Sequence, residues 1–331
     1  MFLRKIVKSN SFLWLLALIS VPIVLFLLGL IQSFDNVDEP LFLLGIFFSL
    51  GMAFLYSMKI ISSKLVLKSE SISVNILIFF ISLFVVMFLL PFISIESISE
   101  VSSKFWFIFA ISSLFYYLGK FFNLKAIEYG EISSVVLLHS ITPIVIGIFS
   151  FIILKELPTW GGFIGAVIIM FAIYFLKLEK THTHFLDPIR SLVKDKATIY
   201  IIISVFAFAV TTNLDKVGSQ LASAYEWVFL SNIFLMIMTI PGCYRHLRKT
   251  KLQLRNIRSM YFVALFAVFQ LVFQMIAILN ILVVYVVTIK VSSIIITVVL
   301  GGLLFKEEGL KRKIIFGLFI VGGVVLITLL G

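Results

Sequence analysis

Residues 282–305 read LVVYVVTIKVSSIIITVVLGGLLF, an apolar run that is interrupted after eight residues by a single cation, Lys290. A run of this length can cross the hydrocarbon core of a bilayer, roughly 30 Å thick, as one helix. A Lys inside such a helix costs about 2.5 to 3.5 kcal/mol on insertion scales. The stretch therefore predicts a membrane-spanning helix whose charge faces a cavity or a polar partner.

Further apolar windows extend this pattern over the whole chain. They fall near residues 11–31, 41–61, 73–92, 105–122, 132–154, 160–176, 198–214, 227–244, 259–279 and 314–330. Of the 331 residues, 61% are apolar and 13% are charged, whereas soluble domains are roughly half apolar and a quarter charged. We predict an all-α integral membrane protein with about 10 to 11 transmembrane helices and almost no soluble domain.

The basic residues lie almost entirely on one side of the predicted membrane. With a cytoplasmic N-terminus, inside segments hold 23 Lys and Arg residues and outside segments hold 3. Positive loops are held in the cytoplasm, so the net charge of +11 indicates cytoplasmic loops and not nucleic-acid binding. This count places Lys59 and Lys120 in inside segments. We predict a multi-pass protein of the cell membrane with its N-terminus in the cytoplasm.

The N-terminal segment 1–40 holds a basic start, the apolar window 11–31 and a short acidic loop. The window is about 20 residues long and has no small-x-small cleavage site, which favours an uncleaved signal-anchor helix over a signal peptide.

Cofactor chemistry has little support in the sequence. Cys243 is the only cysteine, the pair His182 and His184 lacks companion ligands, and no GxxxxGK[ST] motif is present. Two isolated histidines are a weak metal site. We therefore expect no metal, no cofactor and no nucleotide hydrolysis.

The two halves of the chain resemble each other at a shift of 151 residues. The matched positions are Ala126–Ile127 with Ala277–Ile278, Lys155–Glu156 with Lys306–Glu307, and, at a shift of 150, the helix-ending Pro91 with Pro241. Five helices per unit is an odd number, so the two copies must lie in opposite orientations, as in inverted-repeat transporters. We predict a first repeat over 41–180, a basic linker over 181–197 and a second repeat over 198–331.

These motifs resemble those of the drug/metabolite transporter superfamily, specifically a protein with two EamA-like domains. The first unit carries KAIEYG at 125–130, TP at 142–143, LKE at 154–156 and GGFIG at 161–165, and the second carries IKVSS at 289–293, LFKE at 304–307 and glycines at 317, 322 and 323. The resemblance implies ten helices in two inverted five-helix repeats around a central cavity, and alternating-access transport of small metabolites. It leaves the window 11–31 as an extra helix.

Lys290 and His139 are the leading site candidates. His139 occupies the place of Lys290 in the first repeat, and each lies 17 residues before a helix-ending Glu. Polar residues at matching depth predict one shared site, in which Lys290 binds an anionic or carboxylate-bearing group or takes part in proton-linked gating. The structural alternatives are a Lys that is paired or snorkels to the interface, and a His that only packs.

Further polar residues complete the predicted substrate site, namely Thr142, Asn123, Gln274, Gln270 and Glu226. Thr142 precedes a proline, which frees a backbone carbonyl that can line a cavity or merely kinks the helix. Asn123 and Gln274 correspond across the repeats, with Gln270 one turn before Gln274, and such amides either contact substrate hydroxyls or join helices. Glu226 either forms an ion pair with Lys290 or lies in the headgroup region.

Two groups of residues are interpreted as structural. The glycines on the last helix of each repeat, at 161, 165, 317 and 322, allow close helix packing. Glu156 and Glu307 end helices at the membrane surface, where capping is favoured and a gating contact is the alternative.

The leading hypothesis is a secondary transporter, an EamA-like permease that moves a small polar metabolite by alternating access through a central cavity. A flippase for an amphiphilic or lipid-linked substrate is the alternative. An integral membrane enzyme is less favoured, because clustered acidic residues and an HExxH motif are missing. The expected partners are membrane lipid and a small-molecule substrate, without nucleic acid, and a homodimer is left open.

Overall fold

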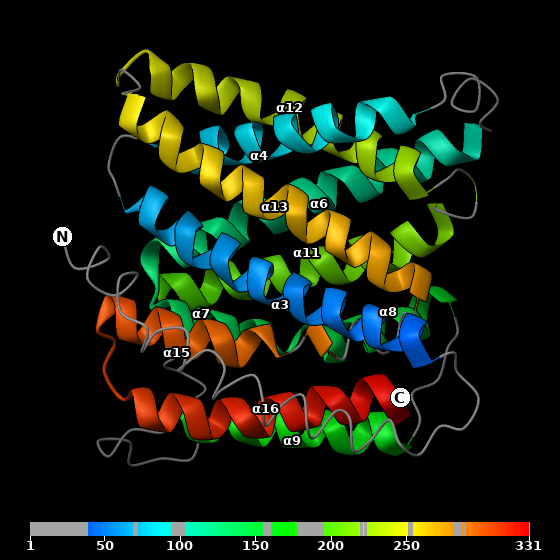
Figure 1. Cartoon of the computed structure of the whole chain (residues 1–331), viewed down its shortest axis with the longest axis vertical. Helices are drawn as coiled ribbons and strands as arrows, with labels where there is room; N and C mark the ends of the chain where they lie inside the picture. The colour runs from blue at the N-terminus through cyan, green and yellow to red at the C-terminus, as the bar shows by residue number, and fades with distance from the viewer. Residues whose placement is uncertain are drawn as a thin grey trace.

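Helices form the described structure, and they run between the same two ends of one bundle (Figure 1). The computed structural model describes residues 39–68, 72–93, 103–154, 160–177, 195–218, 221, 224–250, 254–280, 286, 289–290 and 292–330. The predicted signal-anchor helix in 11–31 and the linker with His182 and His184 lie outside these residues. The described part contains no strand and has 7 helices long and apolar enough to cross a membrane, which confirms the predicted all-α membrane class.

Each half of the chain makes five passes through the bundle. The first half contains α3 (Glu39–Leu67), α4 (Val74–Leu89) with the 3-10 turn η1 (Leu90–Phe92), α6 (Ser103–Tyr129), the pair α7 (Ile132–His139) and α8 (Thr142–Leu154), and α9 (Trp160–Lys177). The second half contains α11 (Lys196–Gly218), α12 (Ala224–Leu247), α13 (Leu254–Asn280), the helical residues 289–290 followed by α15 (Ser293–Phe305), and α16 (Leu310–Leu330). Because five is an odd number, α3 and α11 begin at opposite ends of the bundle.

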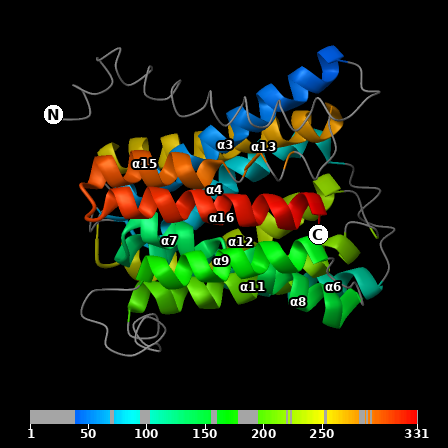
Figure 2. The same ribbon diagram turned by 90° about the horizontal axis from the view of Figure 1, so that it is seen from below.

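The helices of one half pack on their counterparts in the other half. α3 packs on α13 and α6 on α11, which pairs the first pass of each half with the third pass of the other. α4 packs on α12, α7 on α15 and α9 on α16, which pairs the second, fourth and fifth passes with themselves (Figures 1 and 2). Exchanging the halves leaves this set of pairs unchanged, as an inverted repeat requires.

Two helices extend further than the apolar windows that predicted them. α3 continues to Leu67 and α6 to Tyr129, so Lys59 and Lys120 lie inside helices and not in the segments beyond them. With a rise of 1.5 Å per residue, each lysine lies roughly 12 to 14 Å from the end of its helix. The sequence-based placement of both lysines is therefore corrected: they are cations within the bundle.

Pro241 also differs from its predicted place. Pro91 lies in η1 immediately after α4, as a helix-ending proline should, but Pro241 lies inside α12, which continues to Leu247. Proline is tolerated in a transmembrane helix when neighbouring helices satisfy the freed backbone groups. The next residue, Gly242, packs so closely on Asn75 that an added Cβ would lie 2.0 Å from its Nδ2 atom. The helix α12 therefore continues past Pro241, and its next residue is in tight contact with α4.

The fourth pass of each half is broken at corresponding residues. α7 ends at His139 and α8 begins at Thr142, while Lys290 is helical and α15 begins at Ser293, so both flanks of the break match at a shift of 151 residues. The first break precedes Pro143, which has no N–H to continue the helical ladder. Irregular backbone at membrane depth is tolerated only where protein or a water-filled cavity surrounds it. Both breaks must therefore face the interior of the bundle.

Neighbouring glycines on α16 test the packing of the two halves. A Cβ at Gly323 would lie 2.7 Å from Ile169 Cγ1 and 2.8 Å from the Gly165 carbonyl oxygen, whereas a Cβ at Gly322 meets nothing within 4 Å. The close approach thus belongs to Gly323 and not to Gly322, which the sequence singled out. We expect Gly323→Ala to lower the melting temperature of the detergent-purified protein, because the overpacked backbone of α9 must move at a cost of roughly 1 to 3 kcal/mol.

Gly322→Ala is the matched control and should melt like the wild type. Equal melting temperatures for the two variants would contradict a close α9–α16 contact through Gly323.

Candidate functional site

A cavity of about 280 Å³ lies at the two helix breaks. Both halves of the chain line it, through Tyr56, Ile60, Asn123, Ile127, Val135, Val136, His139, Ser140, Thr142, Ile146, Lys290, Ser293, Ile294 and Val324. His139 to Thr142 come from the first break, and Lys290 and Ser293 flank the second. The inverted repeat therefore builds the cavity from corresponding residues of its two copies.

Four of the predicted site residues line this cavity, namely Lys290, His139, Asn123 and Thr142. Gln270 is not in the lining, but its Oε1 accepts a hydrogen bond of 2.6 Å from Lys59 Nζ. Gln274 and Glu226 are also absent from the lining, and Glu226 is buried near the start of α12. In the described chain Glu226 forms no ion pair with Lys290. The structure thus brings together the residues at and beside the breaks, but not the whole predicted set.

The first break fixes the orientation of the His139 ring. The Thr142 hydroxyl donates to the His139 carbonyl oxygen, and its Oγ1 also lies 3.2 Å from His139 Nδ1. A hydroxyl has only one proton to donate, so Nδ1 must be the donor in the second contact. In the neutral ring the proton therefore lies on Nδ1 and leaves Nε2 as an acceptor. Nε2 is buried without a hydrogen-bond partner among the described residues, although His139 itself lines the cavity.

Lys290 lies against an aromatic ring and not against a carboxylate. Its Nζ is 5.2 Å from the ring centre of Tyr56, and Lys59 Nζ is 4.5 Å from the same ring centre. The face of a tyrosine ring attracts a cation by roughly 0.5 to 2 kcal/mol, depending on solvent exposure. This is smaller than the cost of about 2.5 to 3.5 kcal/mol for a Lys at the centre of a membrane helix. The ring alone therefore does not compensate either charge.

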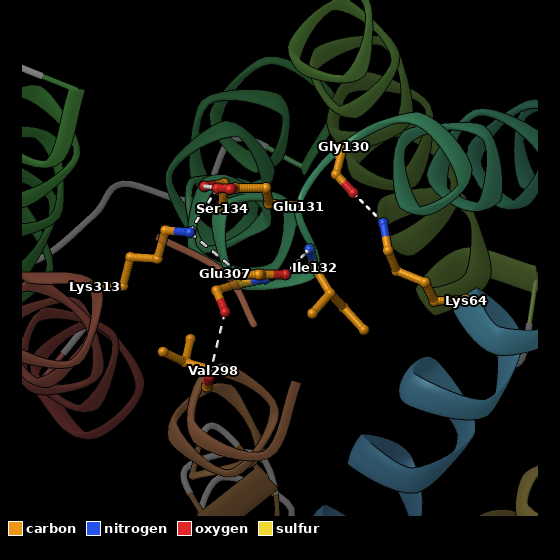
Figure 3. Close-up of polar contacts among 9 residues, drawn as sticks. Lys64, Gly130, Glu131, Ile132, Ser134, Val298, Glu307 and Lys313 are labelled. Carbon is orange, nitrogen blue, oxygen red and sulfur yellow. Dashed lines mark hydrogen bonds and ion pairs between the residues drawn. The ribbon is translucent and has the colours of Figure 1, made fainter. Parts of the chain in front are cut away.

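A polar network joins the two halves at the end of the bundle where α7 begins and α15 finishes. We call it the Glu307 network and define it by Lys64, Glu131, Glu307 and Lys313 (Figure 3). Glu307 accepts hydrogen bonds from the backbone N–H groups of Ile132, at 2.7 Å, and of Ser133. The carboxylate of the second half thereby caps the first turn of α7 in the first half, where an anion is favoured.

Two lysines extend the Glu307 network. Lys313 Nζ lies 2.5 Å from a Glu131 oxygen and 3.2 Å from a Glu307 oxygen. Lys64 Nζ donates to the carbonyl oxygens of Ile127, at 2.9 Å, and of Gly130. The Lys313 and Glu307 side chains are 8% and 3% exposed, so water screens their ion pair far less than a surface pair. Glu307, predicted as a capping residue with gating as the alternative, caps a helix of the opposite half.

An apolar layer separates the cavity from the Glu307 network. Several cavity-lining residues also belong to the largest hydrophobic cluster, namely Ile60, Ile127, Val135, Val136, Ile294 and Val324. On the α15 side a Cβ added to Gly301 would lie 2.4 Å from Ile132 Cγ2, so α15 and α7 are in close contact at this level. Ser133 Oγ also donates to the Val298 carbonyl oxygen at 3.2 Å. The bundle is therefore packed between the cavity and this end.

The sequence comparison agrees with this two-fold organisation. The profile described as the EamA-like transporter family matches residues 43–178 and 195–329, once over each half of the bundle. The chain belongs to the EamA-like transporter family. The predicted resemblance is thereby confirmed, and the protein is a multi-pass membrane protein of a transporter family. No curated protein matches the sequence.

Solved structures share the fold of this EamA-like transporter, with 13 matching chains. One of them, described as "Crystal structure of protein", is similar with a TM-score of 0.52 and 13% sequence identity. The alignment covers 88% of this chain and 97% of that chain. At this identity the likeness concerns the fold alone.

Sequence reasoning missed the lining residue Tyr56, the adjoining Lys59, and Lys120 inside α6. The two lysines were counted with the segments beyond the helices, because the apolar windows end close to them. A local signal was available, since Lys59 follows Tyr56 by three residues and so shares its helix face.

The chain offers a direct test of the cavity in this EamA-like transporter. Cys243 is the only cysteine, so Cys243→Ser gives a cysteine-free background. In it we expect Asn123→Cys to react with a small water-soluble methanethiosulfonate, because position 123 lines the cavity. Leu137→Cys is the control and should stay unlabelled, because Leu137 is 0% exposed in the hydrophobic cluster. Equal labelling rates at the two positions, measured by mass spectrometry, would refute a solvent-reachable cavity.

Proposed function

We propose that this EamA-like transporter carries a small polar metabolite across the cell membrane by alternating access through the cavity between its two halves. The observation that carries the proposal is that the cavity lies at both helix breaks and takes polar side chains from each half. Discontinuous helices at a repeat interface are where secondary transporters bind substrates and coupling ions. A cavity of about 280 Å³ matches a small molecule at the lower end of typical ligand pockets.

Within this proposal the four predicted site residues that line the cavity form the substrate site. Lys290 supplies a positive charge, and Asn123 supplies both a donor and an acceptor. His139 supplies its unpartnered Nε2, and Thr142 holds the His139 ring in place. Gln270 does not contact the substrate but positions Lys59, because its Oε1 accepts a hydrogen bond from Lys59 Nζ.

We assign the Glu307 end of the bundle to the cytoplasm. The described helices place many cations at or near this end, namely Lys64, Lys68, Lys125, Lys196, Arg245, Arg248, Lys249, Arg258, Lys306, Lys311, Arg312 and Lys313. At the opposite end the described cations are Lys104, at the start of α6, and Lys216, near the end of α11. Positive loops are held in the cytoplasm. A cytoplasmic N-terminus follows if the window 11–31 crosses the membrane.

In this arrangement the Glu307 network is a cytoplasmic gate in its closed state. It binds α15 and α16 of one half to the start of α7 in the other, so the halves cannot separate there without breaking it. Capping hydrogen bonds contribute about 1 kcal/mol each. A network of this strength holds the gate shut yet can open within the few kcal/mol that separate conformational states of a protein.

Reconstituted transport tests the assignment of the cavity residues. In proteoliposome uptake or counterflow with a metabolite panel, we expect Lys290→Ala and His139→Ala each to reduce transport at least about tenfold, the equivalent of one lost charged or buried hydrogen bond. Lys311→Ala, on an exposed lysine of α16, is the control and should transport like the wild type. Unchanged transport in both cavity variants would refute the assignment.

Cysteine labelling tests the gate. In the Cys243→Ser background, Val136→Cys places a thiol on the cavity wall beside the apolar layer. We expect adding Glu307→Gln to speed its labelling several-fold, because the neutral amide loses the ion pair and much of the helix cap. Glu308→Gln is the matched control, since Glu308 is exposed and takes no part in the network. The same labelling rate with either glutamine variant would exclude a gate at Glu307.

A further inference from the structure

Two ammonium groups lie close to the ring of Tyr56. Lys290 Nζ is 5.2 Å and Lys59 Nζ is 4.5 Å from its centre, so the two nitrogens are no more than about 10 Å apart. Tyr56 and Lys290 line the cavity, and Lys59, three residues along α3, adjoins the ring of Tyr56. The second cation thus lies directly behind a lining residue.

A third cation adds to this group. Lys120 lies on α6, which packs on α3, and its Nζ is 4.7 Å from the ring centre of Tyr116. Lys59 itself is held by Gln270, whose Oε1 is neutral. Three like charges therefore share one region of the bundle, each with an aromatic ring or an amide beside it.

The described residues supply no counter-charge for these lysines. The ion pairs of the described residues lie elsewhere: Lys125 pairs with Glu128, and Lys313 pairs with Glu131 and Glu307. Asp215 accepts hydrogen bonds from Ser112 and Trp227. Cations within the bilayer are normally paired or face a water-filled cavity. Lys290 on the cavity wall, with Lys59 behind the lining residue Tyr56, is therefore arranged for an occupant that brings negative charge.

We propose that the cavity binds a small organic anion with two negative charges, as carboxylates or as a phosphate, at Lys290 on its wall and within the positive field of Lys59 behind Tyr56. This deepens the proposed transport function and rests on it. Ammonium groups bind carboxylate and phosphate oxygens through charge-assisted hydrogen bonds. Lys120 adds to the positive potential without touching the anion, and the lining residues Asn123 and His139 contact the neutral polar part.

Direct binding separates this proposal from the transport function. Isothermal titration of the detergent-purified protein at constant ionic strength compares succinate with succinamide, and glycerol phosphate with glycerol. We expect at least one dianion to bind and both neutral analogues to fail. Lys290→Gln and Lys59→Gln should each weaken that binding at least about tenfold, and Lys120→Gln by roughly threefold, since it acts at a distance.

Two control variants keep the result interpretable. Lys59→Arg preserves the charge and should bind within about threefold of the wild type, which excludes misfolding as the cause of a loss in Lys59→Gln. Lys311→Gln removes an exposed charge and should leave binding unchanged. Equal binding of neutral analogues, or unchanged dianion binding in both Lys290→Gln and Lys59→Gln, would overturn the proposal.

A second arm distinguishes a free anion from a lipid headgroup. The melting temperature is measured in nanodiscs of phosphatidylcholine with and without phosphatidic acid. If neither free dianion binds but phosphatidic acid stabilises the wild type and not Lys290→Gln or Lys59→Gln, the anion is a lipid phosphate. Absence of both effects overturns the anion site.

The two proposals can fail separately. If neutral metabolites are taken up but no anion binds, the transport function stands and the anion site is rejected. If an anion binds but no substrate is taken up, the anion site stands and the transport function is rejected.

Discussion

A polar group inside a bilayer must find its partner within the protein, because hydrocarbon offers none. Both interrupted helices obey this constraint, since the residues that flank their breaks, His139 and Thr142 in one and Lys290 and Ser293 in the other, line one cavity. Lys290 and Lys59 obey it less completely, with a tyrosine ring and an amide as neighbours. The same constraint thus explains where the cavity is and why Lys290 lies on its wall.

The inverted repeat turns this local constraint into a functional arrangement. Each half brings one broken pass to the interface, and α7 packs on α15, so His139 and Lys290 line the same cavity from opposite halves. The packing also joins the halves beyond the cavity, where Glu307 caps a helix 175 residues away in sequence. The proposed gate at the Glu307 network is made by contacts between the two halves. It therefore opens only when the halves move relative to each other.

The cavity and the Glu307 network use charge in different ways. In the network each described cation has a carboxylate or carbonyl partner, and the charges stabilise the packing of helices. Beside the cavity the lysines have aromatic or amide neighbours and no described carboxylate partner. A charged group that has a partner within the protein stabilises the structure, whereas a charged group without one is available to a ligand. The proposed binding site and the proposed gate therefore lie at different depths of the same bundle.

The sequence by itself determined the membrane class, the repeat, the transporter family and the correspondence of His139 with Lys290, because apolar runs and their polar exceptions are local properties of the chain. Only the tertiary structure decided that Lys59 and Lys120 lie inside helices, that Gly323 makes the close contact, that Glu307 caps α7, and that Gln274 and Glu226 lie off the cavity. These features depend on how far each helix continues and on which helix packs beside it. Contacts between residues far apart in the chain set both, and no window of sequence contains them.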